Sequence, residues 1–353
     1  MDRPAAAVIS FRLGGTDGVS VEAAKWAGAL GHLGFDVRTV AGAGSADAIL
    51  PGLAIDAPEA PADGEIDEAL VGADLVVVEN LCSLPLNPGA AAGVARVLAG
   101  RRAVLHHHDL PWQRDRFAGA PAPPDDAQWI QVTINDLSRR QLAERGIAAR
   151  VVMNSFDVDG AGGDRKRTRE KLGLADGDRL LLQPTRAIAR KNVAGGLAVA
   201  AGIGATYWLL GPAEDGYGPE LEELLAGARC PVIHGAGPGG AGAGADVRDA
   251  YAGCDAVTLP STWEGFGNPA IESAVEKRPL AIGSYPVAGE LRSFGFRWFD
   301  SDDPAPLGRF LDAPDPSLLA HNYEVARRYF SVAELPERLA RLFAEAGWTS
   351  WDG

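Results

Sequence analysis

Short apolar runs alternate with amphipathic stretches along the chain. In the first part of the sequence, apolar runs that predict strands lie at residues 7–11, 36–40, 74–78 and 103–106. The spacing of apolar positions between them predicts helices over residues 19–33 and 90–98. A second series of predicted strands lies at residues 179–183, 205–210, 232–234 and 256–259. This alternation is typical of parallel sheets covered on both faces, so we expect an α/β protein with two doubly wound, Rossmann-like domains.

The length supports two domains, because 353 residues exceed what one ordinary core holds. A polar, glycine-containing run at 157–167 separates the two series and is the predicted linker. We therefore expect one domain over residues 1–160 and another over residues 161–331. The glycine-rich stretch 235–244 lies inside the second series and is interpreted as a loop over a ligand.

The charge balance excludes several classes of partner. A net charge of −14 and a pI near 4.9 argue against nucleic acid, which needs a basic face, and against a polybasic membrane anchor. The three cysteines lack metal-type spacing and suggest no disulfide framework. No signal-peptide pattern or membrane-spanning run is present. We expect a cytoplasmic protein without a transmembrane segment, and nothing in the sequence indicates an oligomeric state.

Two glutamates flank a glycine turn in the second series. Glu264 precedes the turn and Glu272 follows it eight positions later. Asn268 is the predicted helix N-cap, with Pro269 at the first helical position. A fully helical connection would separate the two backbones by about 12 Å, more than the roughly 5 to 9.5 Å between the carboxyl groups of glycosidases. The spacing therefore favours separate roles for the two carboxylates.

Two cations upstream could share a pocket with these carboxylates. Arg186 ends a predicted strand-turn, and Lys191 follows five residues later, just before a helical pattern at 193–201. A guanidinium and an ammonium together suit the phosphates of a departing diphosphate. Arg190 lies between them, and the sequence alone leaves open which arginine contacts phosphate.

The first strand-to-helix turn contains Gly14 and Gly15, where backbone amides could approach a diphosphate. A tight turn without a ligand is the alternative. A dinucleotide fingerprint would require glycine in place of Leu13 and an acidic residue after the second strand, and residues 39–42 offer none. The turn therefore does not favour NAD.

Three consecutive histidines, residues 106–108, follow a predicted strand together with Asp109. They should emerge at the carboxyl edge of the sheet, where open α/β folds bind ligands. A metal site is the alternative, but the other histidines are distant in sequence and no acidic cluster completes an obvious ligand set. The prediction is a substrate-facing segment without a metal.

Taken together, these motifs resemble the retaining GT-B glycosyltransferases of family GT4. The resemblance rests on the Glu264-Gly-Phe-Gly turn with Glu272, the Arg-x4-Lys spacing, and the pair His108 and Asp109. Residues 15–20 and 106–114 are similar to the branch that includes mannosylglucosylglycerate synthases. The chain departs from the GT4 pattern at Ala288, where glycine is common, and in the 235–244 loop near the expected base pocket.

The resemblance implies a GT-B fold, in which residues 332–353 cross back onto the first domain. The first domain would hold the acceptor, and the second a UDP- or GDP-linked sugar whose hexose moves to a small hydroxylated acceptor. The implied catalytic residues are His108, Asp109, Arg186, Lys191 and Glu264. The implied donor-binding residues are Gly14, Gly15, Arg186, Lys191, Glu264, Gly265, Phe266, Gly267, Asn268 and Glu272. No cofactor is required, and Mg²⁺ is compatible with the resemblance without being implied by it.

Rival functions would use the central cleft that the GT-B resemblance implies between two facing domains. A sugar-nucleotide epimerase would act on the nucleotide sugar alone, and a glycoside phosphorylase on a glycoside plus phosphate. A non-catalytic nucleotide-sugar-binding module would bind the donor and never release diphosphate.

Overall fold

The computed structural model describes residues 3–235 and 247–348, and the chain divides into two compact units. The first unit comprises Met1–Ser155 with Val332–Gly353, and the second comprises Phe156–Ser331. The expected boundary at residue 160 lies a few residues later than the observed one. The polar run predicted as a linker belongs to the second unit, where Asp164 caps helix α5 (Arg165–Lys171) and Arg165 forms an ion pair with Asp255.

The first unit contains a seven-stranded parallel sheet in the order β3-β2-β1-β4-β5-β6-β7. Its strands are β1 (Ala5–Leu13), β2 (Asp36–Gly44), β3 (Ala48–Ile49), β4 (Leu75–Glu79), β5 (Ala103–His107), β6 (Trp129–Thr133) and β7 (Ala149–Val151). Its helices are α1 (Gly18–His32), α2 (Asp63–Ala69), α3 (Pro88–Leu98), α4 (Asp136–Ala143) and α13 (Leu335–Glu345). Short 3₁₀ turns lie at Pro51–Leu53, Pro111–Gln113, Asp115–Phe117 and Val332–Glu334.

Alternate side chains of these strands enter two cores, as the period of a strand requires. Ala6 and Val8 of β1 face one core, which includes apolar residues of α1 and α13. Ala7 and Ile9 face the other core, built with α2 and α3. Because both faces are covered, the strands are continuously apolar rather than alternating.

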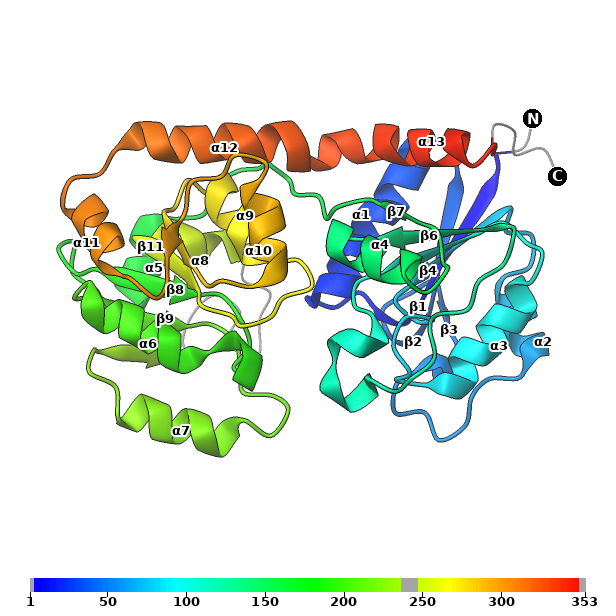
Figure 1. Ribbon diagram of the computed structural model, residues 1–353, viewed down its shortest axis with the longest axis horizontal. Coiled ribbons are helices and arrows are strands. Elements are labelled where there is room, and N and C mark those ends of the chain that lie inside the picture. The colour runs from blue at the N-terminus through cyan, green and yellow to red at the C-terminus, as the bar shows by residue number, and fades with distance from the viewer. Residues whose placement is uncertain (1–2, 236–246, 349–353) are drawn as a thin grey trace. The chain divides into compact units, whose positions relative to one another are not determined.

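The last helix packs on the first. Leu339 and Phe343 of α13 share a core with Trp26 of α1, and Figure 1 shows α13, in red, within the same unit as the blue α1. The helical pattern read at the end of the sequence is therefore part of the first unit.

The second unit contains a six-stranded parallel sheet in the order β10-β9-β8-β11-β12-β13. Its strands are β8 (Leu180–Gln183), β9 (Thr206–Leu209), β10 (Val232–His234), β11 (Ala256–Leu259), β12 (Leu280–Ile282) and β13 (Phe299–Asp300). Its helices, besides α5, are α6 (Val193–Gly202), α7 (Gly218–Ala226), α8 (Val247–Gly253), α9 (Asn268–Val275), α10 (Pro286–Arg292), α11 (Ala305–Asp312) and α12 (Pro316–Phe330). A 3₁₀ turn, η4 (Ala189–Lys191), precedes α6.

One face of this sheet packs on α6 and α7, where Leu181 and Tyr207 meet Leu197 and Leu221. Trp208 points to the other face, near Gly253 at the end of α8. The expectation of two Rossmann-like parallel sheets is confirmed. The strands predicted from apolar runs are all present, whereas β3, β6, β7, β12 and β13 were not predicted.

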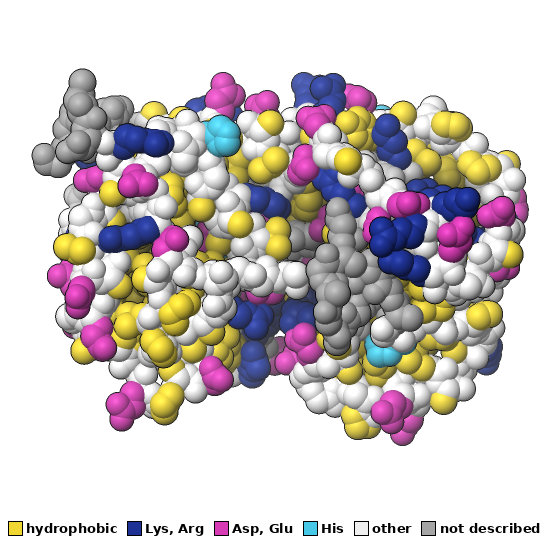
Figure 2. Space-filling view, turned by 180° about the vertical axis from the view of Figure 1, so that it is seen from behind, with side chains coloured by type: hydrophobic (Ala, Val, Ile, Leu, Met, Phe, Trp, Pro, Cys, Tyr) yellow, Lys and Arg dark blue, Asp and Glu magenta, His cyan; other side chains and the backbone are white. Residues whose placement is uncertain are grey.

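Other expectations concern the surface and the cysteines. None of the helices among the described residues is long and apolar enough to cross a membrane. Cys82, Cys230 and Cys254 are all free thiols. On the face drawn in Figure 2, basic side chains are interspersed with acidic ones rather than gathered into one broad basic surface.

Candidate active site

The polar residues of the second unit gather where its central strands end. Arg186 follows β8, Glu214 follows β9, Glu264 follows β11 and Tyr285 follows β12. These four strands are adjacent and parallel, so the loops after them share the carboxyl edge of the sheet. Open α/β sheets bind ligands at this edge.

Lys191 and Glu264 form a buried ion pair at this edge. The Lys191 Nζ atom lies 2.6 Å from Oε1 and 2.8 Å from Oε2 of Glu264, and neither side chain is more than 10% exposed. Asn192, with φ of 50°, ties the two loops together, because its side-chain amide donates to the Pro260 carbonyl oxygen. The pair is therefore held by the loop backbone as well as by charge.

Burial and charge act in opposite directions on this pair. Burial alone would raise the pKa of Glu264, but the charges of Lys191 and Arg190 outweigh it and lower that pKa below its ordinary value. Burial lowers the pKa of Lys191, and the charge of Glu264 opposes this effect. Glu264 is therefore held as a carboxylate.

The two arginines occupy different environments. Arg190 donates to Oε2 of Glu264 at 3.1 Å and to the Trp263 carbonyl oxygen at 2.9 Å. Arg186 is about half exposed and forms an ion pair with Glu214, which is equally exposed. Its charge still contributes to lowering the pKa of Lys191, after the larger lowering effects of burial and of the Arg190 charge. Lys191 and Arg190 therefore lie against the Glu264 carboxylate, and Arg186, which is open to solvent, lies close enough to Lys191 to act on its pKa.

The glycine turn begins helix α9 differently from the sequence prediction. The N-cap is Gly267, with φ of 96°, and Asn268 is the first helical residue, so the predicted Asn268 cap is wrong by one position. A side chain at residue 267 would be strained by this φ and would lie 2.3 Å from the Tyr285 hydroxyl. Only glycine allows this close approach. Glu264 lies in the loop and Glu272 lies within α9, as expected.

The two residues that complete the motif, Phe266 and Glu272, have protein partners. Phe266 is buried and stacks on Phe156, with ring centroids 6.3 Å apart. Glu272 accepts a hydrogen bond from the Tyr251 hydroxyl at 2.6 Å. Glu272 as a whole residue is partly buried.

Buried polar atoms without a partner lie near Glu264. The Tyr285 hydroxyl, the Trp263 Nε1 atom and the Arg190 Nε atom find no hydrogen-bond partner among the described residues. Burial raises the pKa of Tyr285, and the charge of Glu264 adds to the rise. Buried polar groups are normally paired, so this group of unpaired atoms needs an explanation.

In the first strand-to-helix turn of the first unit, close packing accounts for both glycines. Gly14 has φ of 74°, and a Cβ there would lie 2.6 Å from the Ser45 Cβ. A Cβ at Gly15 would lie 3.0 Å from a carboxylate oxygen of Asp17, which is the N-cap of α1 and forms an ion pair with Arg12. The shape of this turn therefore needs no ligand, and donor contact by Gly14 and Gly15 stays a prediction.

The histidine segment surrounds a glutamate that sequence reasoning missed. Glu79, the last residue of β4, is fully buried; its Oε2 atom lies 3.0 Å from Nδ1 of His106 and 2.9 Å from Nε2 of His108. Burial would raise the pKa of Glu79, but the charges and hydrogen bonds of the two histidines lower it to about 2. Burial would lower the pKa of His108, but the hydrogen bond and charge of Glu79 raise it. The sequence signal that could have identified Glu79 is its position as a charged residue directly after the four apolar residues 75–78.

The position of Glu79 bears on whether the histidines could hold a metal ion. The sequence offered no acidic partner for the histidines, and Glu79 is such a partner. Among the described residues, one ligand atom from each of Glu79, His106 and His108 lies within 4.8 Å of the others. The nitrogen–oxygen distances of 2.9 to 3.1 Å are those of direct hydrogen bonds. The expectation of no metal stays a prediction.

His107 and Asp109 point into separate networks. His107 lies between the Ser83 hydroxyl at 2.6 Å and the Gln131 side-chain oxygen at 2.7 Å. Burial lowers the pKa of His107 to about 4. Asp109 forms an ion pair with Arg114 at 2.7 Å. Of the predicted pair, His108 is nearly fully buried and Asp109 is partly exposed.

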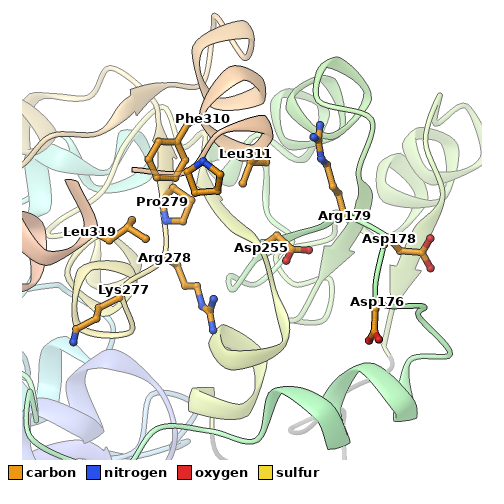
Figure 3. A pocket seen from close by; sticks show the side chains of 12 residues that line it. Asp176, Asp178, Arg179, Asp255, Lys277, Arg278, Pro279, Phe310, Leu311 and Leu319 are labelled. Carbon is orange, nitrogen blue, oxygen red and sulfur yellow. The ribbon is translucent and has the colours of Figure 1, made fainter. Parts of the chain in front are cut away.

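A separate pocket lies at the opposite edge of the second sheet. Its lining includes Arg179, Asp255 and Pro279, which directly precede β8, β11 and β12, and it is therefore at the amino edge (Figure 3). Asp255 is paired with Arg165 and Arg169, and Arg278 donates to backbone carbonyl oxygens. The polar groups of this pocket serve the fold. Most of the glycine loop at 235–244 lies outside the described residues.

Known proteins resemble the chain over nearly its whole length. No family model matches it. Mannosylglucosylglycerate synthase of Thermotoga maritima is 25% identical, with 95% of this chain and 98% of that protein covered. The enzyme of the same name from Petrotoga mobilis is also 25% identical, with 79% and 82% covered.

Solved structures show the same fold. HepE of Anabaena, in complex with UDP and glucose, has a TM-score of 0.73 at 18% identity, covering 97% of this chain and 100% of that chain. Sucrose-phosphate synthase of Thermosynechococcus elongatus has a TM-score of 0.72 at 15% identity, covering 99% and 100%. The expected GT-B fold is confirmed. The chain is a glycosyltransferase with the GT-B fold, and its similarity to the mannosylglucosylglycerate synthases is consistent with a GT4-like branch.

Proposed function

We propose that the chain is a retaining hexosyltransferase that moves a sugar from a nucleoside diphosphate donor to a small hydroxylated acceptor. The observation that carries this proposal is the gathering of three cations at the carboxyl edge of the second sheet, with Arg190 and Lys191 on Glu264 and Arg186 close enough to act on the pKa of Lys191. In a chain with net charge −14, such a group is suited to a diphosphate. The unpaired Tyr285 hydroxyl and Trp263 Nε1 atom beside it support a bound polar ligand.

The proposed roles follow from exposure and charge. Arg186, half exposed, contacts the diphosphate by exchanging Glu214 for phosphate oxygens, and Lys191 supplies a second positive charge. Together they stabilise the negative charge that develops as the diphosphate leaves. Glu272, on the first turns of α9, accepts hydrogen bonds from the ribose hydroxyls. Glu264 positions the sugar and holds Lys191 in place before the donor binds.

The first unit is proposed to act on the sugar and acceptor through His108 and Asp109. The acceptor hydroxyl would attack on the face from which the diphosphate leaves, so no protein nucleophile is required. The names of the two relatives support a glucosylglycerate-type acceptor and a mannosyl donor as the first substrates to test. The UDP in the HepE complex supports testing UDP-linked sugars beside GDP-linked ones. A cytoplasmic location and a reaction without cofactor remain part of the proposal.

Ligand-dependent thermal stability tests the donor half of this proposal. A nucleoside diphosphate at about 100 times its dissociation constant stabilises the folded chain by about 2.7 kcal/mol. We expect either UDP or GDP to raise the melting temperature, with NAD giving no shift. A rise in melting temperature with NAD alone would contradict a nucleotide-sugar site, and so would no rise with any nucleotide. A melting shift accompanied by turnover of the donor alone would favour an epimerase.

A further inference from the structure

Glu79 is the shared hydrogen-bond acceptor of two histidines in the first unit. It ends β4, next to β5, which carries His106 and leads into His108. Its carboxylate accepts from Nδ1 of His106 at 3.0 and 3.1 Å and from Nε2 of His108 at 2.9 Å. The carboxylate has no exposed surface, so these donors replace water as its partners.

The position of the protons follows from the chemistry of the acceptor. An ionised carboxylate accepts hydrogen bonds and donates none. The ring nitrogens that face Glu79 must therefore carry hydrogen, which places a proton on Nε2 of His108 and on Nδ1 of His106. The backbone amide of His108 also donates to the Asn80 side chain at 3.0 Å. The backbone of His108 is thus held by Asn80 and its ring by Glu79 through Nε2, and Nδ1 is the nitrogen left for another partner.

Further charged groups surround this ring. Glu22 on α1 is buried and paired with Lys25 at 2.5 Å. Burial lowers the pKa of His108, Glu79 raises it, and the negative charge of Glu22 adds a smaller rise. Asp109 acts in the same direction and is itself paired with Arg114. His106 and His107 are the neighbouring rings on β5. Of these groups, only Glu79 forms a direct hydrogen bond with the His108 ring among the described residues.

We propose that Glu79 is a positioning residue that fixes the His108 proton on Nε2 and so sets the hydrogen-bonding role of Nδ1. While His108 is an imidazolium, Nδ1–H donates to an oxygen of the substrate. Once His108 is neutral, Nδ1 carries a lone pair instead of a hydrogen. It then accepts a hydrogen bond and no longer donates one to the substrate. Glu79 extends the donor form towards higher pH. The consequence for catalysis rests on the proposed function, whereas the tautomer is a property of the free protein.

The first test needs only the wild-type chain without substrate. In protein labelled with ¹⁵N in its six histidines, His108 is assigned by the loss of its signals in His108→Gln. We expect the neutral form to carry its proton on Nε2 and the ring to titrate above the ordinary pKa of a histidine, about 6.5. An Nδ1–H tautomer, or titration at or below the ordinary value, would overturn the proposal. This outcome does not depend on transferase activity.

The second test is Glu79→Gln, which keeps the shape and removes the charge. We expect the His108 titration to move to lower pH and kcat to fall about 10- to 100-fold with a smaller change in KM, because a charge-assisted hydrogen bond to the ring is lost. The alkaline limb of the pH–rate profile should move with the titration. Ser83→Ala is the matched control, since it removes a buried hydrogen bond to His107 and leaves Glu79 intact. Equal effects of both variants, or an unchanged His108 titration in Glu79→Gln, would overturn the proposal; if Glu79→Gln does not fold, the wild-type spectra decide.

Discussion

Lys191 and Glu264 lie in contact inside the second unit, with the ammonium within hydrogen-bond distance of both carboxylate oxygens. Each comes from a loop that follows a different strand, β8 and β11, and 73 positions of sequence separate them. The contact joins the two halves of the Arg-x4-Lys and Glu motifs into one site. It also means that the charge proposed to act on a diphosphate is already compensated in the free protein.

This relationship predicts that Lys191 serves stability as well as turnover. Replacing it by methionine leaves Glu264 buried beside Arg190 alone, and breaking one partner of a buried pair costs about 3 kcal/mol. The free energy of unfolding of Lys191→Met, measured by urea denaturation, should fall by that amount. The double variant Lys191→Met with Glu264→Gln should recover part of the loss, because the buried carboxylate is gone and only the partly exposed Arg190 loses its ion pair. A double variant as unstable as the single one would contradict the pairing.

Arg186 should show the opposite division between stability and activity. Its ion pair with Glu214 is about half exposed on both sides, and such pairs contribute at most about 1 kcal/mol. Arg186→Ala should therefore unfold within about 1 kcal/mol of wild type while nucleoside diphosphate release falls at least about 100-fold. Arg327→Ala removes a comparably exposed pair with Glu324 and serves as the control. Unchanged turnover in Arg186→Ala would remove Arg186 from the proposed mechanism.

His107 predicts a specific dependence of stability on pH. Its pKa is about 4 in the folded chain and about 6.5 when unfolded, so the unfolded chain binds the extra proton between these values. The stabilisation is complete above pH 6.5 and is lost as the pH falls to about 4, amounting to about 3 kcal/mol.

The variant His107→Gln isolates this effect, because glutamine has no proton to gain. Between pH 7 and pH 4, the free energy of unfolding of wild type should fall by about 3 kcal/mol more than that of His107→Gln. His108 does not affect the comparison, because it is present in both proteins. Parallel curves for the two proteins would show that His107 is not held neutral by burial.

The conformation of the Gly14 turn predicts that replacing Gly14 lowers the stability of the fold and not the affinity for the donor. Alanine at residue 14 would combine a positive φ with a close approach to Ser45 and should lower stability by about 1 to 3 kcal/mol. Gly34→Ala is the matched control, since residue 34 also has a positive φ but no atom within 4 Å of an added Cβ. The difference between the two melting temperatures measures the clash alone. A loss of nucleotide affinity in folded Gly14→Ala would instead support contact with the donor.

Sequence patterns predicted several central strands but missed some short edge strands. Apolar runs such as β4 and β11 predicted strands because both faces of each sheet are buried, and the predicted N-cap, Asn268, is one residue from the observed cap of α9. Short edge strands such as β3 and β13, two residues each, carry too few apolar positions to be seen.

Contacts between residues that are distant in sequence could not be predicted from local patterns. Nothing local joins Glu79 to His108 or Tyr285 to Gly267, since these contacts depend on which strands become neighbours. The polar, glycine-containing run at 157–167 suggested a linker, yet Arg165 pairs with Asp255 across 90 positions. The cations and glutamates of the second unit were found because the GT4 resemblance supplied the missing distance information.

The most direct test of the account is the stereochemistry of the product. Purified protein is incubated with UDP-glucose or GDP-mannose and a glucosylglycerate-type acceptor, nucleoside diphosphate release is measured, and the anomeric configuration of the new bond is read by NMR. We predict diphosphate release that requires the acceptor, and an α-configured product from the α-linked donor. A β-configured product, or sugar transfer that proceeds at the wild-type rate in Arg186→Ala, would contradict the proposed retaining mechanism and its site.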